Sequence, residues 1–184
     1  MSSIIKRALY FAAQKHEGQY RKGNRIPYIV HPVQVAFGVR EYTDDEEIVA
    51  AALLHDTLED CPDVSDNLLK KEFGERVGRI VNEVSLTRDK KYATWKEKKE
   101  AYLAKIKIAS KEALIIVAVD KIMNLQGYFD ALRENSSISE FGGTPNQYRW
   151  FYTEIGHILA SKLKKHPIVK DYTKIWRLYK NKNL

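Results

Sequence analysis

The chain of 184 residues lacks most features that mark secreted or membrane proteins. Its single cysteine, Cys61, excludes a disulfide within the chain and is typical of a reducing compartment. It contains no run of about 18 apolar residues, so we expect no membrane-spanning segment. Residues 1–16 also lack the continuous apolar core of a signal peptide. Together these absences predict a cytoplasmic protein.

Strand signals are also scarce, and the sequence shows no internal repeat and no low-complexity linker. The absence of a linker, together with the length, predicts one domain that spans residues 1–184. β-branched residues gather in LIIVAV, but this run lies inside a longer apolar segment, which favours a buried helix over a strand. The sequence therefore predicts an all-α fold, a single compact helical bundle with a buried site at its centre.

Apolar residues recur at helical spacing along most of the chain. Thr43 or Asp44 is the expected cap of the third helix and Ser65 that of the next segment, which Gly74 divides. The basic segment QYRKGNRIPY is expected to be a loop, and residues 134–147 a loop that closes over the site. Helices are expected over approximately residues 3–16, 31–42, 43–61, 66–85, 90–107, 113–129, 146–164 and 167–180.

Four polar side chains stand inside apolar segments. His55 and Asp56 are adjacent in AAALLHDTLED, His31 lies in PYIVHP, and Asp120 ends LIIVAVD. A buried charge is costly unless it binds something, and neighbours on a helix point about 100° apart, so His55 and Asp56 can hold one ion from one side. Two imidazoles and two carboxylates suit a divalent transition metal such as Mn, Fe, Co or Zn. The set predicts a metal-dependent phosphohydrolase.

Further polar residues follow these four at helical spacing. Glu59 and Asp60 come four residues after His55 and Asp56, and Asn124 comes four after Asp120, which places them one helical turn further on. A metal lowers the pKa of a bound water, and a nearby carboxylate can take or return its proton. We therefore expect acid–base chemistry or substrate contacts from these residues.

Structural explanations compete with some of these assignments. His16, His157 and His166 have no carboxylate at useful spacing and are expected to be structural. Asp120 could instead pair with Lys121 or with a capping group. The segment LEDCPD could be an acidic helix end, and RKGNR a solvated basic turn.

The net charge of +7 favours an anionic ligand without distinguishing a nucleotide from nucleic acid. The segment KYATWKEKKEAYLAKIK has the charge and the aromatic residues for phosphate contact, so a basic nucleic-acid-binding protein with a structural metal is one alternative. Its interleaved glutamates favour a solvated helix face instead, with Tyr102, Leu103 and Ile106 turned inward. We therefore expect a small-molecule nucleotide as partner, with neither nucleic acid nor membrane.

Several segments together resemble the HD-domain superfamily, and specifically the hydrolase domain of RelA/SpoT-type alarmone enzymes. They are FAAQKHEGQYRKG, PYIVHPVQVA, AALLHDTLED, FGERVGRIVNEVS and VDKIMNL, which cover most of residues 8–130. The likeness is greatest to the small stand-alone alarmone hydrolases, including those of metazoans.

This resemblance implies a role for each matching residue. His31, His55, Asp56 and Asp120 match the metal ligands, with Mn²⁺ the usual ion. Glu59 and Asp60 match the catalytic acidic pair that activates water and handles the leaving group. Arg21 and Lys22 match a basic pair at the guanine base, and Asn124 matches a polar residue that faces the nucleoside.

The reaction so implied removes pyrophosphate from the 3′ position of guanosine 3′,5′-bis(diphosphate) or its pentaphosphate form, (p)ppGpp, and leaves GDP or GTP. Two rivals stay open. One is another nucleotide phosphohydrolase of the superfamily, an NADPH 2′-phosphatase or a 5′-nucleotidase. The other is a sensor module without catalysis, which the presence of both Glu59 and Asp60 disfavours.

Overall fold

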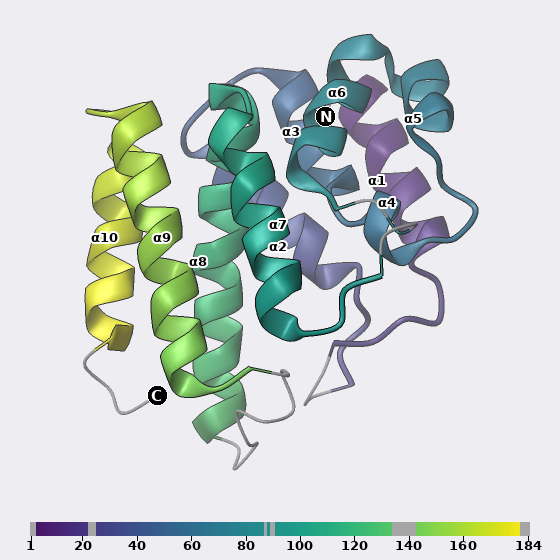
Figure 1. The fold of residues 1–184 in the computed structure, drawn as a ribbon. Coiled ribbons are helices and arrows are strands. Elements are labelled where there is room, and N and C mark those ends of the chain that lie inside the picture. Colours follow the sequence, from purple (N-terminus) through teal and green to yellow (C-terminus); the bar gives the residue numbers. More distant parts are fainter. Residues whose placement is uncertain (1–2, 22–24, 87, 89–90, 134–142, 181–184) are drawn as a thin grey trace.

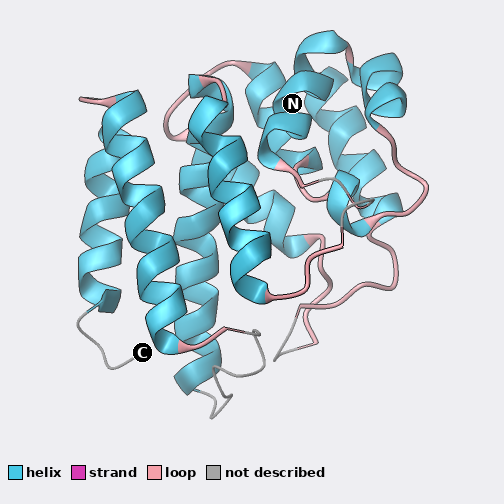
Figure 2. Ribbon diagram, in the orientation of Figure 1, coloured by secondary structure: helices cyan, strands magenta, loops and turns pink. Residues whose placement is uncertain are grey.

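The computed structural model describes residues 3–21, 25–86, 88, 91–133 and 143–180, with backbone alone for residues 128–133. Within these ranges the chain is helical and its one β-type pairing is an isolated bridge between Tyr20 and Pro27 (Figure 1; Figure 2). The all-α prediction is therefore confirmed. The helices are α1 (Ser3–Lys15), α2 (Val30–Arg40), α3 (Glu46–Leu54), α4 (Thr57–Asp60), α5 (Asp66–Phe73), α6 (Glu75–Val84), α7 (Trp95–Ile108), α8 (Lys111–Arg133), α9 (Pro145–Leu163) and α10 (Pro167–Lys180).

Helix α8 lies in the middle of the bundle. Helices α9 and α10 pack against one side of it, and α2, α3 and α6 pack against the other (Figure 1). Helix α1 lies against α3, α5 against α6, and α7 against both α6 and α9. Segments distant in the sequence therefore meet along α8.

The apolar character of α8 on all sides explains its central position. The run from Ala113 to Val119 is buried without interruption, as expected for a helix that has neighbours all around it. Within the described residues, no helix has the length and hydropathy needed to cross a membrane. The interpretation of LIIVAV as a buried helix is confirmed.

The caps of the helices were partly predicted. Ser65 accepts a hydrogen bond from the Leu68 backbone N–H and caps α5, and Gly74, with φ +93°, separates α5 from α6 as predicted. The cap of α3 is Asp45, which accepts from the Glu47 N–H, so the assignment to Thr43 or Asp44 was wrong. Asp45 also pairs with Arg76, and only the folded chain brings that residue close.

The helix predicted over residues 43–61 is in fact two. Helix α3 ends at Leu54, and a turn at His55 and Asp56 precedes the four-residue helix α4. Thr57 donates to the Leu54 carbonyl and stabilises this turn. His55 and Asp56 therefore occupy a turn between two helices rather than the interior of one.

One further boundary differs from the sequence-based expectation. Helix α7 begins at Trp95, capped by Thr94, rather than near residue 90; its buried face of Tyr102, Leu103 and Ile106 is as predicted. The sequence also predicted a loop over residues 134–147. Residues 134–142 lie outside the described part of the chain, so the closure of this loop over the site stays a prediction.

Candidate functional site

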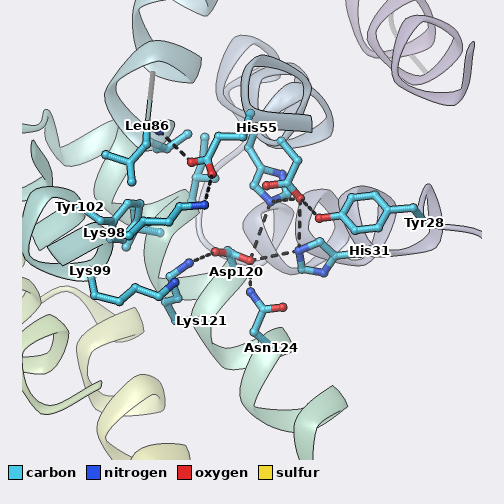
Figure 3. A pocket seen from close by; sticks show the side chains of 15 residues that line it. Tyr28, His31, His55, Leu86, Lys98, Lys99, Tyr102, Asp120, Lys121 and Asn124 are labelled. Atoms are coloured by element: carbon cyan, nitrogen blue, oxygen red, sulfur yellow. Dashed lines mark hydrogen bonds and ion pairs between the residues drawn. The ribbon is translucent and has the colours of Figure 1, made fainter. Parts of the chain in front are cut away.

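Three parts of the fold bring the four predicted ligands together. His31 comes from the first turn of α2, His55 and Asp56 from the turn before α4, and Asp120 from the middle of α8. His31 Nε2 lies 3.1 Å from an oxygen of Asp120 and 3.7 Å from one of Asp56. His55 Nε2 lies 3.1 Å from Asp56 and 3.8 Å from Asp120. Figure 3 shows the imidazoles and Asp120 converging on one point.

This cluster has the donor set of a metal site. Ligand atoms of His31, His55 and Asp56 all lie within 4.8 Å of one another. The Nδ1 atom of His55 is 2.8 Å from the Ala52 carbonyl oxygen, which fixes the tautomer with the proton on Nδ1. The buried Nε2 of His55 has no hydrogen-bond partner among the described residues. A buried ring nitrogen that faces two carboxylates without a hydrogen bond fits a cation between them.

The pKa values of the cluster follow from burial and mutual charge. Burial lowers the pKa of His31, which favours its neutral, ligand-competent form. Burial opposes charge on His55 as well, but Asp56 and Asp120 outweigh it and raise the pKa of His55. His55 in turn lowers the pKa of Asp56, and Lys121 with the imidazoles lowers that of Asp120, both against the effect of burial. Both carboxylates are therefore ionised at neutral pH.

Neighbouring groups hold the carboxylates in place. The Tyr28 hydroxyl donates to Asp56 Oδ2 at 2.7 Å, and the Asn124 amide donates to Asp120 Oδ1 at 2.5 Å. The Lys121 ammonium forms an ion pair with the other oxygen of Asp120. The alternative of an Asp120–Lys121 pair is therefore present in the structure, but together with the imidazole contacts rather than in place of them.

Glu59 and Asp60 lie beside the cluster in different surroundings. Glu59 accepts from the Leu86 backbone N–H at 2.7 Å, and its second oxygen is 3.7 Å from the Lys98 ammonium. Burial, with the charges of Asp56 and Glu59, raises the pKa of Asp60 to about 6. A carboxyl group with that pKa exchanges its proton near neutral pH, as acid–base catalysis requires.

The predicted substrate residues are placed in part. The Arg21 guanidinium lies 5.9 Å from the centre of the Tyr28 ring and donates to Asn124 Oδ1 at 3.3 Å. A Cβ atom at Gly127 would come within 3.3 Å of this guanidinium, so the glycine leaves room for it. Asn124 thus links Arg21 to the Asp120 carboxylate. Lys22 lies outside the described residues.

Two adjoining cavities meet at the cluster. The smaller, of about 110 Å³, is lined by the four candidate ligands with Glu59, Lys98 and Lys99. The larger, of about 1070 Å³, is lined by Arg21, Asp60, Gly127 and the aromatic side chains of α9. The residues that line both are Tyr28, His31, Lys99, Lys121 and Asn124. The larger volume is at the upper end of the range for small-molecule sites, roughly 300–1,000 Å³.

Sequence reasoning missed some of the residues that shape this site. Tyr28 stands in the PYIVHP motif, but nothing in the sequence pairs its hydroxyl with Asp56. Lys98 and Lys99 belong to a helix whose charged residues were interpreted as solvated. Their position just before the inward-facing Tyr102 was the available signal that this face of α7 lines a cavity.

The three histidines expected to be structural lie apart from the cluster centre. His16 is buried, with Nδ1 2.8 Å from Gln19 and its ring beside that of Tyr28. His157 is exposed beside Glu154, and His166 accepts from the Ile168 N–H near the start of α10. None of them touches a candidate metal ligand.

Comparison with known proteins gives matches over most of the chain. The HD domain family matches residues 8–140. Guanosine-3′,5′-bis(diphosphate) 3′-pyrophosphohydrolase of Aquifex aeolicus is 41% identical over 113 residues, which are 61% of this chain and 16% of that protein. The protein of this name from Xenopus tropicalis, MESH1, is 34% identical over 128 residues, 68% of this chain and 69% of the relative.

A solved structure agrees along nearly the whole chain. The structure of a metazoan ortholog of SpoT that hydrolyses ppGpp superposes with a TM-score of 0.76 and 27% identity, covering 97% of this chain and 96% of that one. By contrast, the chain spans about a sixth of the length of the Aquifex relative.

The matched region, residues 8–140, contains the whole His/Asp cluster. Hydrolases with this domain depend on a divalent metal, and the donor set found here can bind one. With the family match over most of its length and the shared fold, this chain belongs to the HD-domain family.

Proposed function

We propose that this chain hydrolyses guanosine 3′,5′-bis(diphosphate), or the pentaphosphate form, to GDP or GTP and pyrophosphate. The observation that carries the proposal is the His/Asp cluster at the junction of a small cationic pocket and a cavity large enough for a nucleotide. The activities named for the Aquifex and Xenopus relatives, and for the metazoan structure, support it.

The proposed metal ligands are His31, His55, Asp56 and Asp120, and the proposed ion is Mn²⁺. When bound, such an ion supplies a water of lowered pKa and neutralises charge on the reacting phosphoryl group. The hydrogen bond from His55 Nδ1 to Ala52 and that from Tyr28 to Asp56 set the orientation of two of these ligands.

Glu59 and Asp60 are the proposed acid–base pair, and each has its own role because the two residues line different cavities. Glu59 lines the small pocket and takes a proton from the attacking water. Asp60 lines the larger cavity, and with its pKa of about 6 it returns a proton to the leaving 3′ oxygen. The new bond joins the water oxygen to the 3′-linked phosphorus, and the bond from phosphorus to the 3′ oxygen breaks. The products are pyrophosphate and a free 3′ hydroxyl.

The nucleoside is proposed to lie in the larger cavity, beside Arg21 and Asn124. A guanidinium can stack on a base and attract phosphate, and Arg21 already lies over the Tyr28 ring. We propose that Lys22, the next residue, contributes a second positive charge. Asn124 faces the same cavity. It accepts a hydrogen bond from Arg21 and donates one to the proposed metal ligand Asp120, and so links the two side chains.

We also propose that this nucleotide is the partner of the site and that the protein acts in the cytoplasm. A nucleotide explains the cationic lining of the pocket, and Cys61 has no second cysteine with which to form a disulfide. Nothing in the proposed reaction requires nucleic acid or a membrane.

The test is Mn²⁺-dependent turnover of guanosine tetraphosphate, with NADPH and 5′-mononucleotides assayed in parallel. We expect GDP and pyrophosphate in equal amounts, and no reaction after the metal is removed by a chelator. Turnover of NADPH or a mononucleotide alone would overturn the substrate but not the metal site. No turnover of any of them would overturn the proposal of an active hydrolase.

A further inference from the structure

Three lysine side chains converge on the small pocket from the side of Asp120 opposite Tyr28 (Figure 3). Lys98 and Lys99 come from α7 and Lys121 from α8. All three line the small pocket, and Lys99 and Lys121 also line the large cavity. The positive charges of Lys99 and Lys121 therefore lie where the two cavities join.

The three ammonium groups differ in their partners. Lys98 is 3.7 Å from Glu59, and Lys121 is paired with Asp120. Among the described residues, Lys99 has no carboxylate within ion-pair distance. Its Nζ atom lies 4.8 Å from the centre of the Phe151 ring and 5.5 Å from that of Trp95. These rings attract a cation weakly and leave its hydrogen-bond donors free.

Lys99 is only partly exposed. Burial, with the neighbouring charges of Lys121 and Lys98, lowers the pKa of Lys99 to about 8, against the effect of Glu59 and Asp120. It remains largely protonated at neutral pH. A cation held next to two others, with no carboxylate partner within the described ranges, makes this corner of the pocket attractive to an anion.

We propose that Lys99 binds the terminal phosphate of the substrate's 3′ diphosphate and thereby selects a diphosphate over a monophosphate. The inference rests on the proposed function, because it assigns one part of that substrate. The 3′-linked phosphorus lies at the metal ligands and the nucleoside extends into the large cavity. The terminal phosphate then falls on the lysine side of Asp120, where Lys99 is the lysine that has no carboxylate partner in the described part of the chain. Lys121 supports it from α8.

Arg21 serves a different part of the ligand. It lies on the Tyr28 side of the His/Asp cluster and donates a hydrogen bond to Asn124. Lys99 instead lies among the aromatic side chains of α7 and α9. Loss of the Lys99 charge should therefore weaken diphosphate binding without weakening nucleoside binding. A residue that merely packed on its aromatic neighbours would not give this separation.

The test compares Lys99→Met with Lys96→Met in the full chain. Methionine keeps the length and packing of the stem and removes the charge. Lys96 is a matched control because it lies on the same helix, also stands over an aromatic ring, that of Trp150 at 5.9 Å, and lines neither of the two cavities. Binding of inorganic pyrophosphate, orthophosphate and GDP is measured by calorimetry on Mn²⁺-loaded protein, dialysed to remove unbound ion.

We expect Lys99→Met to bind pyrophosphate about tenfold or more weakly, in line with loss of a charge-assisted hydrogen bond. Affinities for orthophosphate and GDP should stay within about twofold, and Lys96→Met should change none of the three. Lys99→Arg, which keeps the charge, should retain preference for pyrophosphate. If Lys99→Met does not fold, Lys99→Gln takes its place in the same comparison.

Unchanged pyrophosphate binding in Lys99→Met, an equal loss of GDP binding, or no measurable pyrophosphate binding by the wild type would each overturn the proposal. The proposed function fails separately. A wild type that binds pyrophosphate through Lys99 but does not hydrolyse guanosine tetraphosphate would refute the substrate and keep the diphosphate site. Normal hydrolysis with binding insensitive to Lys99 would refute only the role of Lys99.

Discussion

His55 uses its two ring nitrogens for different purposes. Nδ1 is bound to the Ala52 carbonyl of the preceding helix, and Nε2 faces Asp56 and Asp120. The first contact fixes the ring orientation, so the second nitrogen is positioned before any ion arrives. Preorganisation of this kind is how neighbouring groups tune a metal ligand.

Asp56 is the carboxylate placed closest to His55, and its loss should remove the metal. We expect Asp56→Ala to lose Mn²⁺ binding and turnover together, because the site loses one of its four proposed ligands and one of its two negative charges. Metal content after dialysis and turnover of guanosine tetraphosphate measure the two effects. Asp44→Ala, at a side chain that is 98% exposed, is the control. An active variant free of metal would refute the assignment of Asp56.

Glu59 should be separable from the metal ligands. Glu59→Gln keeps an oxygen that can accept from the Leu86 N–H but cannot take a proton from water. We expect normal Mn²⁺ content and turnover lower by about 100-fold or more, the usual contribution of a general base. Glu75→Gln, at an exposed glutamate, is the matched control. If turnover of Glu59→Gln were unchanged, the base would have to be Asp60 or water.

The contact between helices α2 and α8 decides whether His31 and Asp120 meet. The two helices approach closely at Gly38, where a Cβ atom would lie 2.6 Å from Cγ1 of Val119 and 3.2 Å from Cε of Met123. Val119 is buried and stiff at χ1, so it has little room to yield. Glycine at this position therefore sets the distance between two helices that carry candidate ligands.

Gly38→Ala should destabilise the fold through this contact. We expect the free energy of unfolding to fall by about 1–3 kcal/mol, the usual cost of overpacking, and Mn²⁺ affinity to fall with it. Urea denaturation and metal titration measure the two quantities. Val119→Ala removes the clashing methyl groups, so the double variant should lose less stability than the sum of the single changes. Simple additivity would show that the two helices can separate without strain.

An ionic network ties the ends of several helices together across the bundle. Arg76 on α6 contacts Asp45 at the start of α3 at 2.7 Å, Glu47 at 2.6 Å and Glu112 on α8 at 2.5 Å. These bonds lower the pKa values of Asp45 and Glu112. About a third of each of the side chains of Arg76, Asp45 and Glu112 is exposed, so solvent screens the network in part.

The network should make stability depend on pH in the acid range. The pKa values of Asp45 and Glu112 are lower in the folded chain than their usual 3.8 and 4.5. Their contribution is therefore present above these values and is lost as the pH falls through the folded pKa values. We expect Arg76→Met to lose about 1–2 kcal/mol at pH 7 and much less at pH 3, measured by urea denaturation. An equal loss at both pH values would assign the effect to packing.

Much of the candidate site could be predicted from the sequence because its polar side chains stand among apolar neighbours. His31, His55, Asp56 and Asp120 stand in apolar segments, and the structure brings all four together. The roles of the His/Asp cluster and of the acidic pair in turnover stay predictions until they are measured. The local sequence pattern did not predict the break in the helix at His55 or the cap at Asp45. Each has a partner distant in the sequence besides its local hydrogen bond. Arg76 pairs with Asp45, and the Ser85 hydroxyl donates to the His55 carbonyl.

By itself, the sequence determined the helical class, the central position of α8 and the identity of the candidate ligands, because hydrophobic periodicity and misplaced polar residues are local properties. Only the tertiary structure decided which other groups face the cluster. It placed Tyr28 on Asp56, Asn124 on Asp120, and Lys99 at the junction of the two cavities. These contacts join different helices and loops, and their geometry arises from how those segments pack around α8 rather than from spacing along the chain.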